Sequence, residues 1–161
     1  MSIEYNLIAS SALPERAALE YLAKLLACDR EYSDPDGVAR GSELRVGVLR
    51  TSVDHDPEMS ELLGGVTEIL TLFFHPSKFL TEDHDARIFA ELMEAAAQFF
   101  EDFPQAKGLF TFQGEEIYLQ RLGEDGIILD ERLSGPDYNR DGVLDALLAK
   151  YTVREIDQVL L

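Results

Sequence analysis

The sequence has little cysteine, few basic residues and no long apolar run. Its single cysteine, Cys28, excludes a disulfide within the chain of 161 residues. Because Cys28 falls on the apolar side of a predicted helix, we interpret it as a buried hydrophobic residue rather than a reactive thiol. The apolar runs are too short to span a bilayer, and the N-terminus lacks the basic start of a secretory signal. We therefore expect a cytoplasmic protein with no membrane partner.

Basic residues are scarce relative to acidic ones. The sequence contains 14 Lys and Arg residues and 31 Asp and Glu residues, which gives a formal net charge of −17. This balance argues against nucleic-acid binding, which needs a basic surface, and against attraction to an anionic membrane. A basic protein partner would be attracted by such a charge. The alternative is that the charge serves only solubility.

Nucleophile and phosphate-binding motifs are also missing. There is no G-x-S-x-G, phosphate loop or G-x-G-x-x-G. The acids that could do acid–base chemistry fall in predicted turns or on the polar side of a helix, where solvated charge is their usual role. They are Glu91, Glu94, Glu101, Glu115, Glu116, Glu124 and Asp125. We predict no enzyme, and keep as an alternative a small hydrolase or ligand-binding domain that uses carboxylates in a cleft.

The clearest pattern lies in the middle of the chain. Val66–Phe74 is almost continuously apolar and predicts a central strand buried on both faces. Asp85–Phe100 then repeats apolar residues every three or four positions, which predicts an amphipathic helix whose start Thr81 or Asp83 can cap. Three short strands are predicted to follow, at Leu109–Phe112, Ile117–Leu122 and Ile127–Leu129.

The flanking regions supply further elements. Alternation predicts strands at Ile3–Ala9 and Leu44–Val48, separated by a helix from Pro14 to about Ala27 and a long polar loop. The inward side of that helix is predicted to be Ala18, Leu22, Leu25, Leu26 and Cys28. A turn is predicted at residues 34–37, and one or two amphipathic helices at Gly142–Leu161.

The order of these elements predicts an α+β fold. Residues 1–161 are expected to form a single domain with two layers, in which helices cover a mostly antiparallel sheet of about five to six strands. The order β-α-β-β-α-β indicates a ferredoxin-like core, with extra strands and a C-terminal helix. Another two-layer α+β arrangement is the alternative.

The segment 137–145 matches the first nine positions of a calcium-binding loop. Its candidate ligands are Asp137, Asn139, Asp141, the carbonyl of Val143, and Asp145, with Gly142 at the sharp turn. Leu148 stands where such a loop needs a bidentate Glu, so the hypothesis is a low-affinity calcium site, with no other cofactor expected. The alternative, which we favour, is a turn in which Asp141 caps the next helix.

The histidines offer a weaker metal signal. His55 and His84 each stand between two aspartates, and His75 precedes Pro76. No third ligand has metal-site spacing, so we predict solvated histidines.

Several segments resemble one family of small bacterial proteins. They are the strand Ile3–Leu7, the pair Phe73-Phe74, the pair Lys78-Phe79, the stretch Leu109–Glu115 leading into Ile117–Leu119, and the strand Ile127–Leu129. In these features the chain is similar to the immunity proteins paired with the swarming-inhibition (Sit) contact-dependent toxins of myxobacteria.

The resemblance implies a binding function without catalysis. An immunity protein neutralises its cognate toxin by blocking the toxin's functional surface, and such toxins are often basic nucleases, which suits the acidic charge. The expected partner is therefore a basic toxin domain. The loops Asp29–Arg40 and Asp54–Gly64 are the expected contact regions, since polar loops on a rigid sheet can vary between partners.

Overall fold

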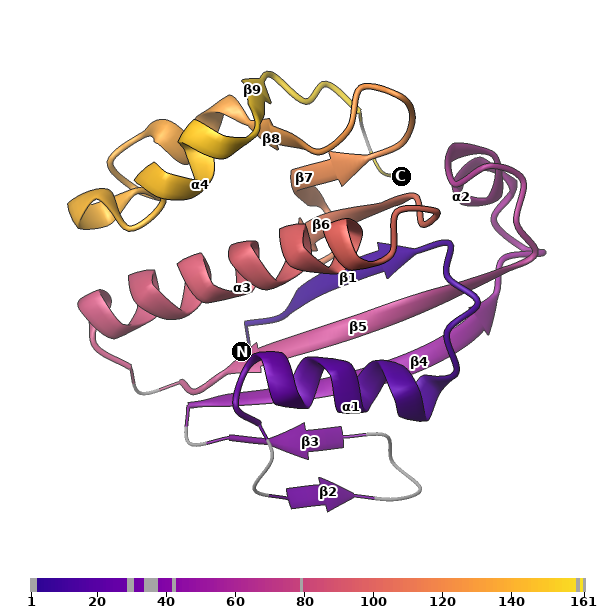
Figure 1. Cartoon of the computed structure of the whole chain (residues 1–161), viewed down its shortest axis with the longest axis horizontal. Helices are drawn as coiled ribbons and strands as arrows, with labels where there is room; N and C mark the ends of the chain where they lie inside the picture. The colour runs from indigo at the N-terminus through magenta and orange to yellow at the C-terminus, as the bar shows by residue number, and fades with distance from the viewer. Residues whose placement is uncertain are drawn as a thin grey trace.

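The computed structural model describes residues 3–28, 31–33, 38–41, 43–78, 80–158 and 160, with only the backbone described for 31–33. Within these ranges the chain forms an α+β fold, in which one open sheet packs against helices (Figure 1). The α+β class predicted from the sequence is therefore confirmed. The turn predicted at residues 34–37 and Phe79 of the family resemblance lie outside the described residues.

The sheet has nine strands among the described residues, in the order β2-β3-β4-β5-β1-β6-β7-β8-β9. Every neighbouring pair is antiparallel except β8 and β9. The predicted number of about five to six strands is too low. β2, β3 and β9 have three residues each and mix polar with apolar positions, so they lack the continuous apolar stretch that predicts the equally short β8. The bounds are β1 (Tyr5–Ala9), β2 (Glu31–Ser33), β3 (Val38–Arg40), β4 (Leu44–Ser52), β5 (Glu68–Pro76), β6 (Gly108–Phe112), β7 (Glu116–Arg121), β8 (Ile128–Asp130) and β9 (Thr152–Arg154).

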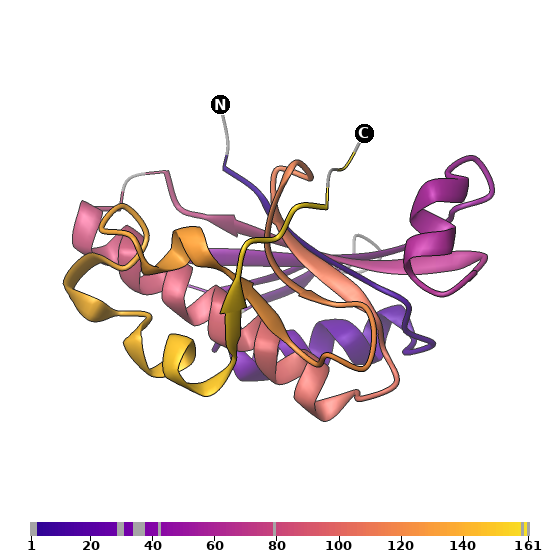
Figure 2. The same ribbon diagram turned by 90° about the horizontal axis from the view of Figure 1, so that it is seen from above.

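The longer helices lie on one side of this sheet. Figure 2 shows α1, α3 and α4 on the same side, whereas α2 stands at the end where β4 and β5 are joined. Each of α1 and α3 connects strands that are not sheet neighbours, and β4, β5, β1 and β6 are adjacent in the sheet. The helices are α1 (Glu15–Leu25), α2 (Pro57–Leu62), α3 (Glu82–Asp102) and α4 (Asp145–Lys150), with 3₁₀ turns η1 (Glu131–Ser134) and η2 (Arg140–Gly142).

Helix α3 follows from its sequence. The Thr81 hydroxyl caps its start by accepting a hydrogen bond from the backbone N–H of His84 at 3.2 Å. The apolar side predicted for this helix is buried, including Phe89, Leu92 and Phe100. Fully burying one such side chain stabilises the fold by about 1.5–3 kcal/mol. The opposite side carries the exposed acids, as the sequence predicts.

Strand β5 is central but not buried on both faces. It pairs with β4 on one edge and β1 on the other. Leu70, Leu72 and Phe74 are fully buried beneath the helices, while Thr71 and Phe73 on the other face are only partly buried. The prediction of burial on both faces is therefore wrong for the centre of β5, where the longer helices cover one face. Near its start, Ile69 on the other face is buried in a small cluster with Val53 and Leu63, against which Met59 of α2 packs.

Two further predictions need correction. In α1, Leu25 is 40% exposed, whereas Leu19 is buried; the predicted burial of Cys28 is confirmed. Of the one or two helices predicted at Gly142–Leu161, α4 is present, whereas Thr152–Arg154 forms the strand β9 beside β8 in place of a second helix. The chain after β9 is held by a buried carboxylate, since Asp130 Oδ2 accepts from the N–H of Ile156 at 3.1 Å.

Among the described residues, no helix combines the length and apolar character that crossing a membrane requires.

Candidate functional site

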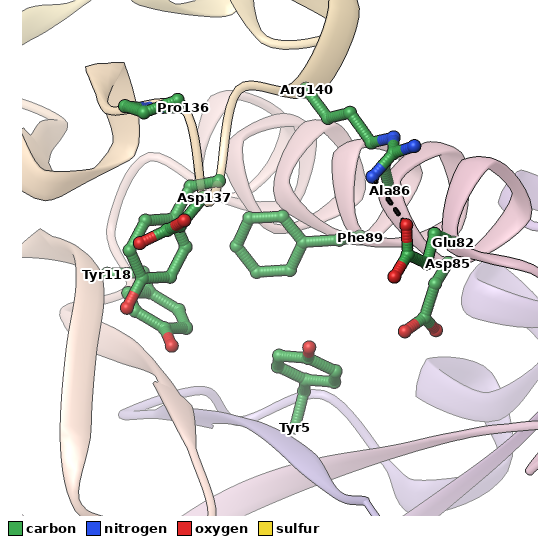
Figure 3. Close-up of a pocket in the computed structure, with 10 residues that line it drawn as sticks. Tyr5, Glu82, Asp85, Ala86, Phe89, Tyr118, Pro136, Asp137 and Arg140 are labelled. Atoms are coloured by element: carbon green, nitrogen blue, oxygen red, sulfur yellow. Dashed lines mark hydrogen bonds and ion pairs between the residues drawn. The ribbon is translucent and has the colours of Figure 1, made fainter.

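An open hollow lies beside the start of α3. Its volume is about 370 Å³, at the low end of the range of about 300–1,000 Å³ typical of ligand pockets. Four aromatic rings line it: Tyr5 from β1, Phe89 from α3, Tyr118 from β7, and Tyr138 from the segment between η1 and η2. Figure 3 shows Tyr5, Phe89 and Tyr118 around the open space, with the hydroxyl of Tyr5 directed into it. We refer to this site as the aromatic hollow.

Ring packing fixes the walls of the aromatic hollow. The Tyr5 ring lies 5.6 Å from Phe89, and Phe89 meets Tyr118 edge-on at 5.4 Å between centroids. Tyr118 in turn meets Tyr138 edge-on at 5.5 Å. The ring of Phe110 in β6 stacks on the Tyr5 ring and is nearly parallel to it, with 5.9 Å between the two centroids. Edge-to-face and offset contacts of this kind are favourable, so the rings form a preformed wall.

Carboxylates surround the opening. Glu82 and Asp85 come from the first turn of α3, and Asp137 comes from the far side of the hollow (Figure 3). Arg140 forms ion pairs with two acids at the start of α3. Its Nη1 lies 2.8 Å from Glu82 Oε2, and its Nε lies 2.9 Å from Asp83 Oδ1. Within the described part of the chain, the side chains of Asp85 and Asp137 make no ion pair or hydrogen bond. The rim therefore keeps two unpaired negative charges.

Tyr5 and Tyr118 remain neutral at ordinary pH. Burial raises the pKa of Tyr5 to about 12, with the charge of Asp85 and the nearby Tyr138 acting in the same direction. Burial also raises the pKa of Tyr118, as do Tyr138 and a hydrogen bond to Glu116. The site is therefore an uncharged aromatic floor with an anionic rim. Its described lining combines these rings with the acids Glu82, Asp85 and Asp137 and with Arg140, an arrangement suited to binding.

A second candidate surface runs along the exposed side of α3. Glu91, Glu94, Gln98 and Glu101 follow one another at three- and four-residue steps and are all exposed. We call this row the α3 ridge. A groove of about 410 Å³ lies between the ridge and the end of α1, where Leu25 and Leu26 contribute apolar surface. Another groove, of about 250 Å³, separates the ridge from α4.

The calcium-loop residues take part in a turn that uses their oxygens internally. The side-chain amide of Asn139 donates to Asp145 Oδ1 at 2.7 Å, and Asn139 Oδ1 accepts from the N–H of Leu144 at 2.7 Å. Asn139, rather than Asp141, therefore holds the start of α4. Asp141 itself has a φ of 55°, in the left-handed region. Val143 is the residue that follows η2.

The described residues contain no group of three or more His, Cys, Asp or Glu side chains placed to hold a metal ion. Calcium binding by 137–145 remains a prediction, which a calcium titration of thermal stability would test. The histidines are separated: His75 lies 3.6 Å from Glu4 and His84 lies 3.4 Å from Glu43, while His55 is exposed in a turn.

The predicted contact loops contain regular secondary structure. Residues 57–62 form α2, and the described parts of 29–40 form β2 and β3. The acids of the two predicted turns, Glu115, Glu116, Glu124 and Asp125, are exposed as expected. None of them lines the aromatic hollow.

The sheet face opposite the helices has an unusual polar composition. Four buried side-chain atoms there have no hydrogen-bond partner among the described residues: Asn6 Oδ1, His75 Nδ1, Thr111 Oγ1 and Gln120 Oε1. Asn6 and Thr111 are direct cross-strand neighbours in β1 and β6. Buried polar groups are normally paired, so this row lowers the stability of the fold.

No protein-family model, curated protein or solved structure matches this chain. The resemblance to Sit immunity proteins therefore stays a prediction from the sequence.

Proposed function

We propose that this chain is a non-enzymatic immunity protein that binds and neutralises a cognate basic toxin in the cytoplasm. The family resemblance motivates the toxin partner. The ferredoxin-like arrangement belongs to the same proposal, with β4-β5-β1-β6 as its four core strands and α1 and α3 as its two crossings.

The observation that carries the proposal is the exposed side of α3. This helix contains seven acids and one arginine. Its α3 ridge stands between two grooves with apolar surface, and the aromatic hollow lies at the beginning of the same helix. Interfaces combine apolar contacts that determine affinity with charges that determine association rate and partner choice. This side of α3 offers both, and the charges would attract a basic surface.

The first experiment is a pull-down of the full chain with the product of the adjacent open reading frame. We expect a basic toxin that binds with nanomolar affinity, equivalent to about −12 kcal/mol, and whose toxicity is lost on co-expression. Association should slow as salt is added, because electrostatic steering is screened. If the neighbouring product neither binds nor harms cells, the proposal is wrong.

Charge reversal locates the surface. Glu94→Lys lies between the two grooves and should slow association with the toxin at least about tenfold at low salt, with little change in stability. Glu115→Lys changes the same charge at the β6–β7 turn, which projects away from the helices (Figure 2). Equal effects of the two variants would show that only total charge matters and would place the toxin elsewhere than on α3.

A further inference from the structure

The aromatic hollow has features that the protein's own packing does not require. Its floor is formed by rings from four separate segments, and the hydroxyl of Tyr5 points into open space (Figure 3). That hydroxyl makes no hydrogen bond within the described part of the chain. On the rim, Asp85 and Asp137 are exposed and unpaired there. A preformed apolar site with a few convergent polar groups is the usual form of a binding pocket.

The charge of the lining selects a cation. Three lining carboxylates, Glu82, Asp85 and Asp137, face one lining guanidinium, that of Arg140, which leaves a net of two negative charges. A helix N-terminus by itself favours an anion. Here the first turn of α3 carries Glu82, Asp83 and Asp85, which oppose that effect and make the opening unfavourable for a phosphate or carboxylate.

Aromatic faces add a second attraction for the same ligand. Cations bind over the faces of Tyr and Phe rings, and arginine does so more often than lysine. The chain shows this contact at the wall of the hollow, because the guanidinium of Arg132 lies over the Tyr118 ring at 5.5 Å from its centroid. It also shows a guanidinium held by the rim acids, in the pair formed by Arg140 and Glu82.

We propose that the aromatic hollow receives one arginine or lysine side chain of the basic protein partner. The cationic group lies between Asp85 and Asp137, and the aliphatic part packs on Tyr5 and Phe89. This inference rests on the proposed function and deepens it by naming an anchor site. A fixed aromatic pocket that buries one side chain is the kind of place where interface energy concentrates.

The test uses a small cation instead of the partner. The full chain is titrated with N-acetyl-arginine methylamide and N-acetyl-lysine methylamide, and the ring signals of Tyr5 and Phe89 are followed by NMR. We expect saturable shifts of these signals in the millimolar range, stronger with arginine. N-acetyl-glutamate methylamide should produce none. No saturable shift with either cation, or an equal response to the glutamate derivative, would overturn the proposal.

Variants connect the signal to the rim. The double variant Asp85→Asn and Asp137→Asn should weaken binding of the arginine probe about tenfold, which corresponds to about 1.4 kcal/mol. Both residues are exposed, so the fold should persist, and circular dichroism checks this. The control Glu124→Gln with Asp125→Asn removes two exposed acids from the β7–β8 turn and should leave binding unchanged. Equal weakening by the two double variants would show that the site has no specificity and would overturn the proposal.

The two proposals can fail separately. If the chain neutralises a toxin but the hollow binds neither cation, the anchor site is wrong and the immunity function stands. If the hollow binds arginine while the neighbouring product does not bind the chain, the cation site stands and the immunity function is wrong. If both hold, the double Asn variant should also weaken toxin binding about tenfold or more, chiefly by faster dissociation. Unchanged toxin affinity would remove the hollow from the interface.

Discussion

The guanidinium of Arg121 donates a hydrogen bond to the carbonyl oxygen of Phe103 at 2.7 Å, which joins the end of β7 to the end of α3. The same group also donates to the carbonyl oxygens of Phe100 and Ala106, and it lies over the Phe100 ring at 5.1 Å. The last carbonyls of a helix have no partner within the helix. Arg121 therefore provides the C-terminal cap of α3 from a strand 15 or more residues away.

Replacing Arg121 should destabilise the protein substantially. Arg121→Ala removes the shared side-chain donor of the three carbonyls, although the carbonyl of Phe103 keeps the N–H of Ala106 at 3.0 Å. The substitution should lower the free energy of unfolding by about 2–3 kcal/mol. Arg121→Lys should recover only part of this, because an ammonium group lacks the planar fork of donors. Urea denaturation measures both changes. The control is Arg87→Ala, whose exposed pair with Glu43 at 3.4 Å should contribute less than about 1 kcal/mol. Similar losses at positions 121 and 87 would contradict the capping role.

Close approach of three elements makes Gly108 difficult to replace. A Cβ added there would collide with the carbonyl oxygen of Ile8 and approach the Phe100 ring to 2.8 Å. Gly108→Ala should therefore lower the free energy of unfolding by about 3 kcal/mol. Gly123→Ala is a matched control, since no atom lies within 4 Å of its added Cβ, and should change stability by less than about 0.5 kcal/mol. A neutral effect at Gly108 would mean that β1 and α3 can separate at low cost.

Local patterns explain which parts of the fold could be predicted. The alternation in β1 and β4 and the apolar stripe of α3 are properties of neighbouring residues, so the sequence shows them directly. β9 could not be predicted, because neighbouring residues alone do not determine it. Thr152–Arg154 follows an amphipathic segment and becomes a strand only because the edge of β8 accepts it. Tertiary context decides such short elements, and local propensity does not.

The aromatic hollow could not be predicted by the same means. Its rings come from positions 5, 89, 118 and 138, and each has an ordinary local explanation. Tyr5 and Tyr118 are typical strand residues, and Phe89 belongs to the buried side of α3. Tyr138 lies inside the predicted calcium loop, whose pattern depends on the residues on either side of it. Only the fold brings these rings together.

Thr111 offers an opportunity to stabilise the protein. Its side chain is fully buried in β6, and its hydroxyl has no hydrogen-bond partner in the described part of the chain. Thr111→Val keeps the shape and removes the buried polar group, so the free energy of unfolding should rise by about 1 kcal/mol. Thr71→Val, in β5 on the same face, is the control: that side chain is partly exposed, and the substitution should have little effect. A loss of stability in Thr111→Val would show that an ordered water satisfies the hydroxyl.

Protonation of His75 should weaken the fold in mildly acidic solution. Burial lowers the pKa of His75 below its ordinary value, and the charge of Arg45 on β4 lowers it further, against an opposing effect of Glu4. The unfolded chain therefore binds the proton at a higher pH than the folded chain does. Between the unfolded pKa of about 6.5 and the lower folded pKa, acidification favours unfolding.

The measurement compares the unfolding free energy of the natural chain with that of His75→Gln from about pH 7.5 to about 5.5. The natural chain should lose more stability than the variant across this interval, and most of the difference should develop below about pH 6.5. His55→Gln, at an exposed turn, controls for the general effect of removing a histidine. If the natural chain instead gains stability relative to His75→Gln as the pH falls, the ion pair with Glu4 outweighs burial, and protonation of His75 stabilises the fold.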